Sequence, residues 1–344
     1  MPRIFDGYLN SVGYLYPSEA EAEDGAKLGG TGFFVRLPLT RPGFDFLCLV
    51  TNKHIVDAGS STVRLNTRDG AFDIIPLDGA KWHYHPDGDD IAICPVGFNT
   101  STHNIDGIHI DNFLTKKIVE QYDIGVGDDA FVVGRFISRE GKVRNLPAAR
   151  FGAIAQMPGE PIVLEGEKVA QESYLIEARS IPGYSGSPVF VSIPPKPPAP
   201  SIPIPENEPE RGRFLAVLPE LYKILGHNQK RNSAFQLGPW LVGIGYCEIF
   251  NNNQVYNTLT GAPVPNMYVR ASSGMMGVIP AWRVIDVLEG PEIKAIINDL
   301  NVVLEREEGN SDSDQVYARA VEENPQHREV LTRLWNVHLR RTCK

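Results

Sequence analysis

Short runs of apolar, aromatic and β-branched residues, separated by Gly, Pro, Asn and Asp, recur along most of the sequence. The first is Val12–Tyr16, and the last before the C-terminal region is Met275–Ile279. Many short strands with few long helical patterns are typical of an all-β sandwich or barrel. A polar connection near residues 98–110 separates the runs into two sets. The sequence therefore predicts an all-β protein with two lobes.

The 344 residues leave room for this arrangement, because a domain has about 100–200 residues. We expect a first lobe over residues 1–110, a second lobe over 111–290 and a helical, acidic C-terminal tail over 291–344. An acidic loop is predicted at Glu19–Asp24. Helical apolar spacing is found in three segments, at residues 284–288, 292–304 and 329–339.

The second lobe is interrupted by a proline-rich insertion at about residues 194–238. Half of the residues from Pro194 to Pro209 are proline, 8 of 16, which disfavours a helix or a central strand and favours an exposed loop. A short helix is predicted at 218–225. We expect a peripheral surface loop. The alternative is a docking element for a regulatory protein, because residues 214–225 are apolar for a loop.

Composition excludes several functional classes. A net charge of −9 argues against nucleic acid or an anionic membrane surface as the main partner. No apolar stretch approaches the roughly 20 residues that a membrane span needs, and no signal peptide is visible. Four cysteines in this length cannot form a disulfide scaffold. We expect a soluble, cytoplasmic protein.

The strongest chemical signal is the run Gly183–Pro188, which reads Gly-Tyr-Ser-Gly-Ser-Pro and enters the apolar strand Val189–Val191. A serine hydroxyl attacks a carbonyl only when a base removes its proton and donors stabilise the resulting oxyanion. Flanking glycines expose the hydroxyl of Ser185 and let the amides of Gly183 and Ser185 point at one spot. The alternative is a plain Gly/Ser/Pro turn before a strand.

A candidate base and a candidate acid precede this turn in the chain. His54 follows the strand that ends at Thr51, and Asp90 precedes the apolar run Ile91–Ile93. The order His, Asp, Ser is that of chymotrypsin-like enzymes. Taken alone, His54 would be a structural histidine and Asp90 a turn residue. Two neighbouring aspartates could also take the role of Asp90, namely Asp87 and Asp89.

Together these motifs resemble trypsin-like serine peptidases, in particular bacterial members without disulfides of the high-temperature-requirement type. The resemblance covers about residues 29–288 and implies a chymotrypsin-like fold of two six-stranded antiparallel barrels with a helical tail. The matching segments are Gly29–Val35, Val50–Val56, Asp90–Ile93, Gly183–Pro188 and Gly274–Ala281.

The resemblance implies a serine endopeptidase that needs no cofactor and acts on a protein or peptide. Ser185 would be the nucleophile and His54 the general base. Asp90 would orient the imidazole, and the amides of Gly183 and Ser185 would form the oxyanion hole. Regulation through a partner protein would act at the insertion or the tail.

The serine turn departs from the family pattern at two positions. Tyr184 replaces the aspartate that pairs with a freshly cleaved N-terminus in secreted trypsins, and Ser187 replaces a glycine. These departures motivate the alternative of a catalytically silent or partner-activated protein that serves as a binding module.

Substrate preference is predicted from two features. The resemblance places Arg179 at the base of the specificity pocket, where its guanidinium would favour an acidic side chain before the scissile bond. The alternative is a surface arginine. The backbone of Gly243–Tyr246, including Gly245, would pair with the substrate as an added strand.

No metal site is predicted. His83 and His85 share one face of an extended segment with Cys94 not far away, but zinc needs further ligands at organised spacing. Cys48, Cys94 and Cys247 lie in apolar runs, where buried and inert thiols are expected.

Overall fold

The computed structural model describes most of both predicted lobes and the first part of the tail. The predicted helices at 218–225 and 329–339, Arg179 and nearly all of the insertion lie outside the described residues. The described ranges are 3–25, 29–98, 101–137, 139–163, 170–178, 183–193, 207, 209, 211–213, 216–217 and 239–308, with side chains to 305.

The first sheet lies within residues 12–109 and has the strand order β5-β4-β1-β2-β3-β7-β6, with β8 paired in parallel to β2. Six strands were predicted; the other two, β6 and β8, have two residues each and are too short to show an alternating pattern. The strands are β1 (Val12–Tyr16), β2 (Gly30–Pro38), β3 (Asp45–Thr51), β4 (Thr62–Asn66), β5 (Phe72–Pro76), β6 (His83–Tyr84), β7 (Ala92–Pro95) and β8 (Ile108–His109).

The second sheet is a closed barrel of six antiparallel strands in the order β10-β11-β14-β13-β12-β9, as predicted. The mostly β fold with two sheets and a helical C-terminal part is thereby confirmed. The strands are β9 (Asp129–Gly134), β10 (Ala148–Gln156), β11 (Tyr174–Glu177), β12 (Pro188–Val191), β13 (Trp240–Tyr256) and β14 (Pro263–Pro280).

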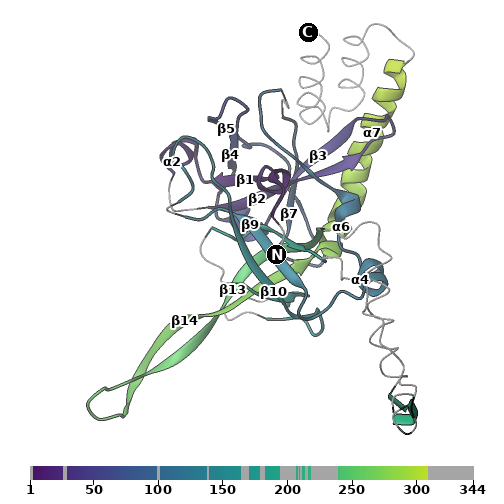
Figure 1. The fold of residues 1–344 in the computed structure, drawn as a ribbon. Helices are drawn as coiled ribbons and strands as arrows, with labels where there is room; N and C mark the ends of the chain where they lie inside the picture. The colour runs from purple at the N-terminus through teal and green to yellow at the C-terminus, as the bar shows by residue number, and fades with distance from the viewer. Residues whose placement is uncertain are drawn as a thin grey trace.

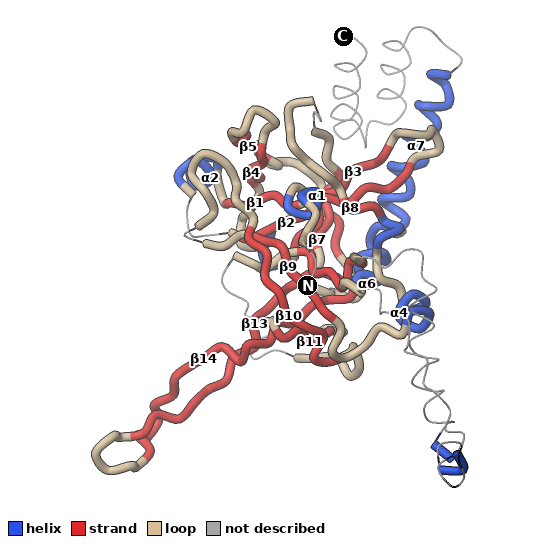
Figure 2. The backbone as a smooth tube through the Cα atoms, viewed as in Figure 1, coloured by secondary structure: helices blue, strands red, loops and turns tan. Residues whose placement is uncertain are grey.

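Two barrel strands are much longer than predicted. The sequence indicated runs of eight and five residues at Trp240–Cys247 and Met275–Ile279, whereas β13 has 17 residues and β14 has 18. The outer parts of β13 and β14 pair with each other from Phe250↔Ser272 to Tyr256↔Pro263. They form an arm, residues 248–275, that projects from the barrel (Figures 1 and 2). The arm contains asparagines and prolines, which are uncommon in strands, so the sequence pattern did not predict strands there.

Short helices join the strands. The predicted acidic loop Glu19–Asp24 is instead α2. Ser18 caps this helix, since its Oγ accepts from Glu21 N (3.3 Å) and donates to Glu21 Oε2 (2.8 Å), and Gly25 ends it with φ 69°. The other helices before the tail are α1 (Asp6–Leu9), α3 (Lys53–Asp57), the 3₁₀ helix η1 (Ile110–Asn112) and α4 (Lys116–Tyr122).

Two longer helices follow the barrel. They are α6 (Ala281–Leu288) and α7 (Pro291–Glu308), each a few residues longer than predicted. α7 reaches the first lobe, where Thr40 N and Oγ1 donate to Asn301 Oδ1 (2.9 and 3.0 Å). No described helix is both long and apolar enough to cross a membrane.

The lobes share one apolar core with these helices. The largest cluster of buried side chains draws on the first sheet, the barrel and both helices, so the lobes are packed as one unit. Its members include Phe33, Val50, Phe131, Phe190, Ile279, Val284, Leu288, Ile293 and Ile296.

Candidate active site

His54 and Asp90 lie side by side at adjoining strand ends. His54 is in α3 directly after β3, and Asp90 precedes β7, which pairs with β3 at Thr51↔Ala92. Asp90 Oδ2 is 2.6 Å from His54 Nδ1, and Asp90 Oδ1 accepts from His54 N at 2.8 Å. The carboxylate thus holds both the ring and the main chain of the histidine.

Three main-chain contacts hold Asp90 in place. It is the central residue of a three-residue turn closed by Ile91 N donating to Asp89 O (2.7 Å). Its own carbonyl accepts from Asn52 Nδ2 (2.8 Å), and its amide donates to Gln171 Oε1 (3.3 Å). Gln171 comes from the second lobe, so both lobes position this aspartate.

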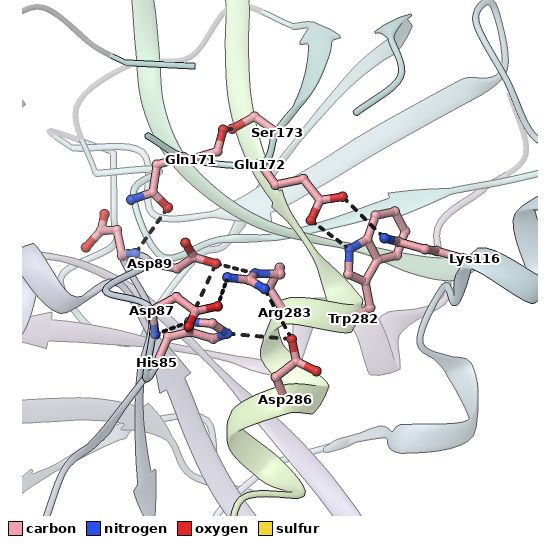
Figure 3. A network of polar contacts seen from close by, with 11 residues as sticks. His85, Asp87, Asp89, Lys116, Gln171, Glu172, Ser173, Trp282, Arg283 and Asp286 are labelled. Atoms are coloured by element: carbon pink, nitrogen blue, oxygen red, sulfur yellow. Dashed lines mark hydrogen bonds and ion pairs between the residues drawn. The ribbon is translucent and has the colours of Figure 1, made fainter. Parts of the chain in front are cut away.

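The structure distinguishes the three candidate aspartates. Asp90 contacts His54, whereas Asp87 and Asp89 contact Arg283 of α6 (Figure 3). The His54 side chain is 49% exposed and that of Asp90 is 18% exposed. The imidazole is therefore accessible from solvent on one side and supported by a more buried carboxylate on the other.

The serine turn depends on two glycines in the left-handed region. Gly183 has φ 101° and Gly186 has φ 82°, conformations that other residues adopt only with strain. A Cβ on Gly186 would lie 1.9 Å from Thr31 O, and one on Gly183 would lie 2.7 Å from Arg135 O. The sequence-based expectation of a tight glycine turn around Ser185 agrees with this geometry.

Thr31 of β2 joins the serine turn to the first lobe. Its amide donates to Ser185 O (2.9 Å), and its hydroxyl donates to Gly183 O (2.7 Å). The same hydroxyl accepts from Arg135 N (2.9 Å). Thr31 therefore fixes the carbonyls of both Gly183 and Ser185.

Ser185 lies at the junction of the lobes. A Cβ added to Gly30 would lie 2.4 Å from Ile55 Cδ1 and 2.9 Å from Ser185 O, so the serine main chain and the residue after His54 adjoin the same glycine. Among the hydrogen bonds of the described residues, Ser185 Oγ donates to Tyr246 O at 3.5 Å and not to His54. Catalytic hydrogen bonds are often long or misaligned without substrate.

The amides of Gly183 and Ser185 are the predicted oxyanion donors. Neither donates to another described residue.

Tyr184 anchors the turn in the barrel. Its ring is buried in the core of the second lobe, and its hydroxyl donates to Ala148 O (3.1 Å). Burial raises the pKa of Tyr184, so the phenol stays neutral. The other departure, Ser187, is fully buried, and its Oγ has no hydrogen-bond partner among the described residues. Of the two departures, Tyr184 therefore supports the turn through its side chain, whereas the Ser187 hydroxyl makes no described contact that would do so.

Gly245 is fastened to the serine turn through its main chain. Its amide donates to Ser187 O (2.9 Å), and its carbonyl accepts from Gly186 N (2.8 Å). Since β12 pairs with β13 only as far as Ile244, the first residue of Gly243–Tyr246 with an edge beyond these pairs is Tyr246. Arg179 lies outside the described residues, so its predicted pocket role stays a prediction.

Several site residues were not predicted from the sequence, namely Thr31, Asn52, Gln171 and Arg283, which touch the candidate triad or its immediate supports. Tyr246 was predicted as part of the substrate-pairing backbone, but not as the acceptor of the Ser185 hydroxyl. Only Thr31 and Asn52 carried a usable signal, because they lie inside segments that resemble the peptidase family. Gln171 and Arg283 reach the site only through folding.

The histidines that were considered as metal ligands, His83 and His85, lie next to carboxylates. His83 Nδ1 pairs with Glu292 Oε2 (2.8 Å), while His85 lies between Asp89 and Asp286 (3.7 and 3.6 Å). Within the described residues, no group of three or more His, Cys, Asp or Glu could hold a metal ion. Cys48, Cys94 and Cys247 are free thiols, and burial raises the pKa of Cys48.

Comparisons with known proteins bear on the fold. No protein-family model matches the chain, and no curated protein matches it either. Among solved structures, it is similar to the protease domain of MamO from Magnetospirillum magneticum, in the apo form. The TM-score is 0.44 and the identity 14%, over 82% of this chain and 98% of that one.

A second solved structure is Rv3671c from M. tuberculosis H37Rv, in the inactive form of a serine-to-alanine mutant. Here the TM-score is 0.37 and the identity 15%, over 82% of this chain and 87% of that one. Both neighbours have the trypsin-like serine protease fold.

Proposed function

We propose that this protein is a serine endopeptidase that cleaves peptide bonds through an acyl-enzyme. The observation that supports it best is the 2.6 Å contact between His54 Nδ1 and Asp90 Oδ2 at a lobe junction that also contains Ser185. With Asp90 accepting the proton on Nδ1, the neutral imidazole has Nε2 free to act as a base.

The reaction follows from this tautomer. His54 Nε2 takes the proton of Ser185 as its oxygen attacks the peptide carbonyl, and the amides of Gly183 and Ser185 stabilise the oxyanion. His54 then gives the proton to the leaving amine. Water, deprotonated by His54, then attacks the acyl-enzyme, and His54 returns that proton to Ser185 Oγ as the acid product leaves. No step requires a cofactor.

A substrate strand can pair with the edge of β13 that begins at Tyr246. This edge continues into the arm beyond the last residue that β12 covers, so an extended peptide could add to it as a further strand. A protein or peptide substrate fits such an edge, since main-chain hydrogen bonds supply affinity without regard to side chains.

The test is active-site labelling with a fluorophosphonate probe, which reacts with an activated serine. We expect the protein to be labelled, the Ser185→Ala and His54→Ala variants to lose labelling, and Ser187→Ala to keep it. Ser187 is a matched control because it lies in the same turn, buried and without a described hydrogen-bond partner. Labelling retained in Ser185→Ala would overturn the proposal.

One observation favours a second candidate, a partner-activated or silent protein that binds polypeptides. The hydroxyl of Ser185 donates to Tyr246 O rather than to His54, an arrangement that a bound partner could change. Labelling that appears only when a candidate partner protein is added would support partner activation, and binding of unfolded polypeptides without any labelling would support the silent alternative.

A further inference from the structure

A polar network joins the start of α6 to the loop that precedes Asp90 and to the segment of Gln171 and Glu172 (Figure 3). At its centre is Arg283, whose Nε donates to Asp89 Oδ2 (2.5 Å) and whose Nη2 donates to Asp87 Oδ2 (2.9 Å). Arg283 Nη1 also lies 3.6 Å from Asp286 Oδ2, one turn further along α6. The guanidinium thus bridges the last helices to the loop that carries Asp90.

The contact with Asp89 is the one that reaches the candidate site. Asp89 precedes Asp90, and its carbonyl closes the tight turn in which Asp90 is the central residue. The Asp89 side chain is only 4% exposed, and a buried carboxylate is costly unless it is paired. Arg283 is the closer of the two partners of this carboxylate, since His85 Nδ1 lies 3.7 Å from the same oxygen, so removing Arg283 would weaken the hold on Asp89 and loosen the turn.

The neighbouring residue on α6 fastens the second segment. Trp282 Nε1 donates to Glu172 Oε2 (3.3 Å), and Lys116 lies 3.7 Å from Glu172 Oε1. Glu172 follows Gln171, whose side-chain oxygen accepts from the amide of Asp90. Trp282 and Arg283 therefore hold two of the chain segments that meet at Asp90, and the third contains Asn52 and His54.

The helix behind these contacts is well supported. The opposite face of α6 carries Val284 and Leu288, both buried in the core shared by the lobes. The following helix adds a contact to the same first-lobe segment, where Glu292 pairs with Lys81 (2.7 Å). The backbone of α6 at Arg283 is therefore held in place, which keeps the guanidinium next to the carboxylates of Asp87 and Asp89.

We propose that Arg283 is a positioning residue that fixes Asp90, through Asp89, in the orientation that binds the His54 ring. This inference rests on the proposed peptidase function. A guanidinium can donate to two carboxylates along fixed directions, whereas a lysine ammonium at the same position keeps the charge without the fork. The charge and the geometry can therefore be tested separately.

The first experiment compares Arg283→Lys and Arg283→Met in peptidase assays. Both variants are expected to lower kcat with little change in KM, because substrate does not touch Arg283. A misplaced catalytic group can reduce the rate by up to about 100-fold. Arg283→Lys is expected to lose activity despite its retained charge. Asp89→Asn is expected to lower kcat as well. In a variant that carries both the Arg283 and the Asp89 change, the loss of kcat should be smaller than the two separate losses combined, because both changes remove the same contact.

The second experiment does not depend on activity. In the Ser185→Ala background, the proton shared by His54 Nδ1 and Asp90 should give a far-downfield proton NMR signal, because short hydrogen bonds deshield it. We expect this signal to move upfield or broaden in Arg283→Lys. The control is Lys294→Ala on α7, which breaks an exposed pair with Glu289 at the C-terminal end of α6 (3.8 Å) and should leave the signal unchanged.

The two measurements separate failure of the inference from failure of the proposed function. Variants that lose thermal stability but keep both kcat and the downfield signal would show a purely structural role for Arg283 and overturn the inference. A parent protein that takes up no fluorophosphonate would count against the peptidase, while the NMR comparison would still decide whether Arg283 orients Asp90.

Discussion

Thr31 serves two main-chain groups with one hydroxyl, accepting from Arg135 N and donating to Gly183 O. Thr31→Val keeps the shape and removes the hydroxyl, so both buried groups lose their partner. An unsatisfied buried group costs about 1–3 kcal/mol. We expect a loss of that order in the free energy of unfolding, measured by urea denaturation, together with weaker fluorophosphonate labelling.

Thr31→Ser is the control for this prediction. Serine retains the hydroxyl, so labelling should return towards the level of the parent protein. Equal labelling of the valine variant and the parent would show that the Gly183 carbonyl does not need this bond.

Asp90→Asn tests the proposed role of the carboxylate. An amide can donate to His54 Nδ1 and so favours the tautomer with the proton on Nε2, which cannot act as a base. The corresponding change in a well-characterised triad lowers kcat about 10⁴-fold. We expect a similar fall in kcat with a native circular dichroism spectrum. An active variant would show that His54 does not depend on Asp90.

Buried tyrosines make stability sensitive to alkaline pH. Burial raises the pKa of Tyr14, Tyr174 and Tyr246. Below about pH 10 these phenols are protonated in both states, whereas above it the unfolded chain releases protons that the folded protein retains. The free energy of unfolding should therefore fall as pH rises beyond about 10, and phenolate absorbance from these residues should appear together with unfolding.

Tyr14→Phe is the matched variant. The Tyr14 hydroxyl is buried without a hydrogen-bond partner among the described residues, so the substitution should cost little at neutral pH and make the alkaline decline less steep. Phenolate absorbance that rises while the protein stays folded would contradict this linkage.

At the scale of secondary-structure elements, we expect the arm to contribute little to the stability of the barrel. Barrel pairing ends at Glu248↔Met276, and Phe250 faces Ser272 further out. Replacing residues 251–271 with Asn-Gly, which favours a two-residue hairpin turn, should leave the unfolding midpoint of the barrel unchanged. An isolated two-stranded hairpin adds little stability. Thermal denaturation followed by circular dichroism provides the measurement.

A substitution inside the barrel is the control for the arm. Met276 is fully buried on β14, so Met276→Ala should cost about 2–5 kcal/mol. If the shortened arm were as destabilising as this change, the arm would be part of the folding unit.

Element types were predictable where the pattern was simple. β12 was predicted at its observed residues, Pro188–Val191, because it is a fully apolar run after a turn. α2 was missed because an acidic sequence looks like a loop unless Ser18 and Glu21 are recognised as a capping box. The outer halves of β13 and β14 lack apolar alternation, since an exposed ribbon has no buried face to record in the sequence.

At the scale of the whole molecule, the shared core predicts a single unfolding transition. Phe190 stacks on Phe131 (centroids 5.0 Å apart) and packs edge-on against Tyr8 (4.8 Å). Phe190→Ala should cost about 3–5 kcal/mol and shift the transitions of both lobes together. Single-tryptophan variants that retain Trp82 or Trp240 would report each lobe, and separate transitions would contradict a common core.

The candidate site was predictable in its reacting groups and not in its supports. His54, Asp90 and Ser185 stand beside strands and glycines that have local signatures. Arg283 does not: it is 194 residues from Asp89, and nothing near it in the sequence marks a partner. Contacts of this kind arise from the packing of α6 between the lobes, which local patterns do not encode.

That separation has a consequence for the order in which the protein is made. At about 5–20 residues per second, the ribosome adds Arg283 some tens of seconds after Asp89. During this interval the aspartate loop lacks its contact with Arg283, and Ser185 is added about halfway through it. On the proposed peptidase function, the nascent chain would acquire a fully oriented His54–Asp90 pair only after Arg283 has been added, which would delay cleavage of neighbouring nascent polypeptides.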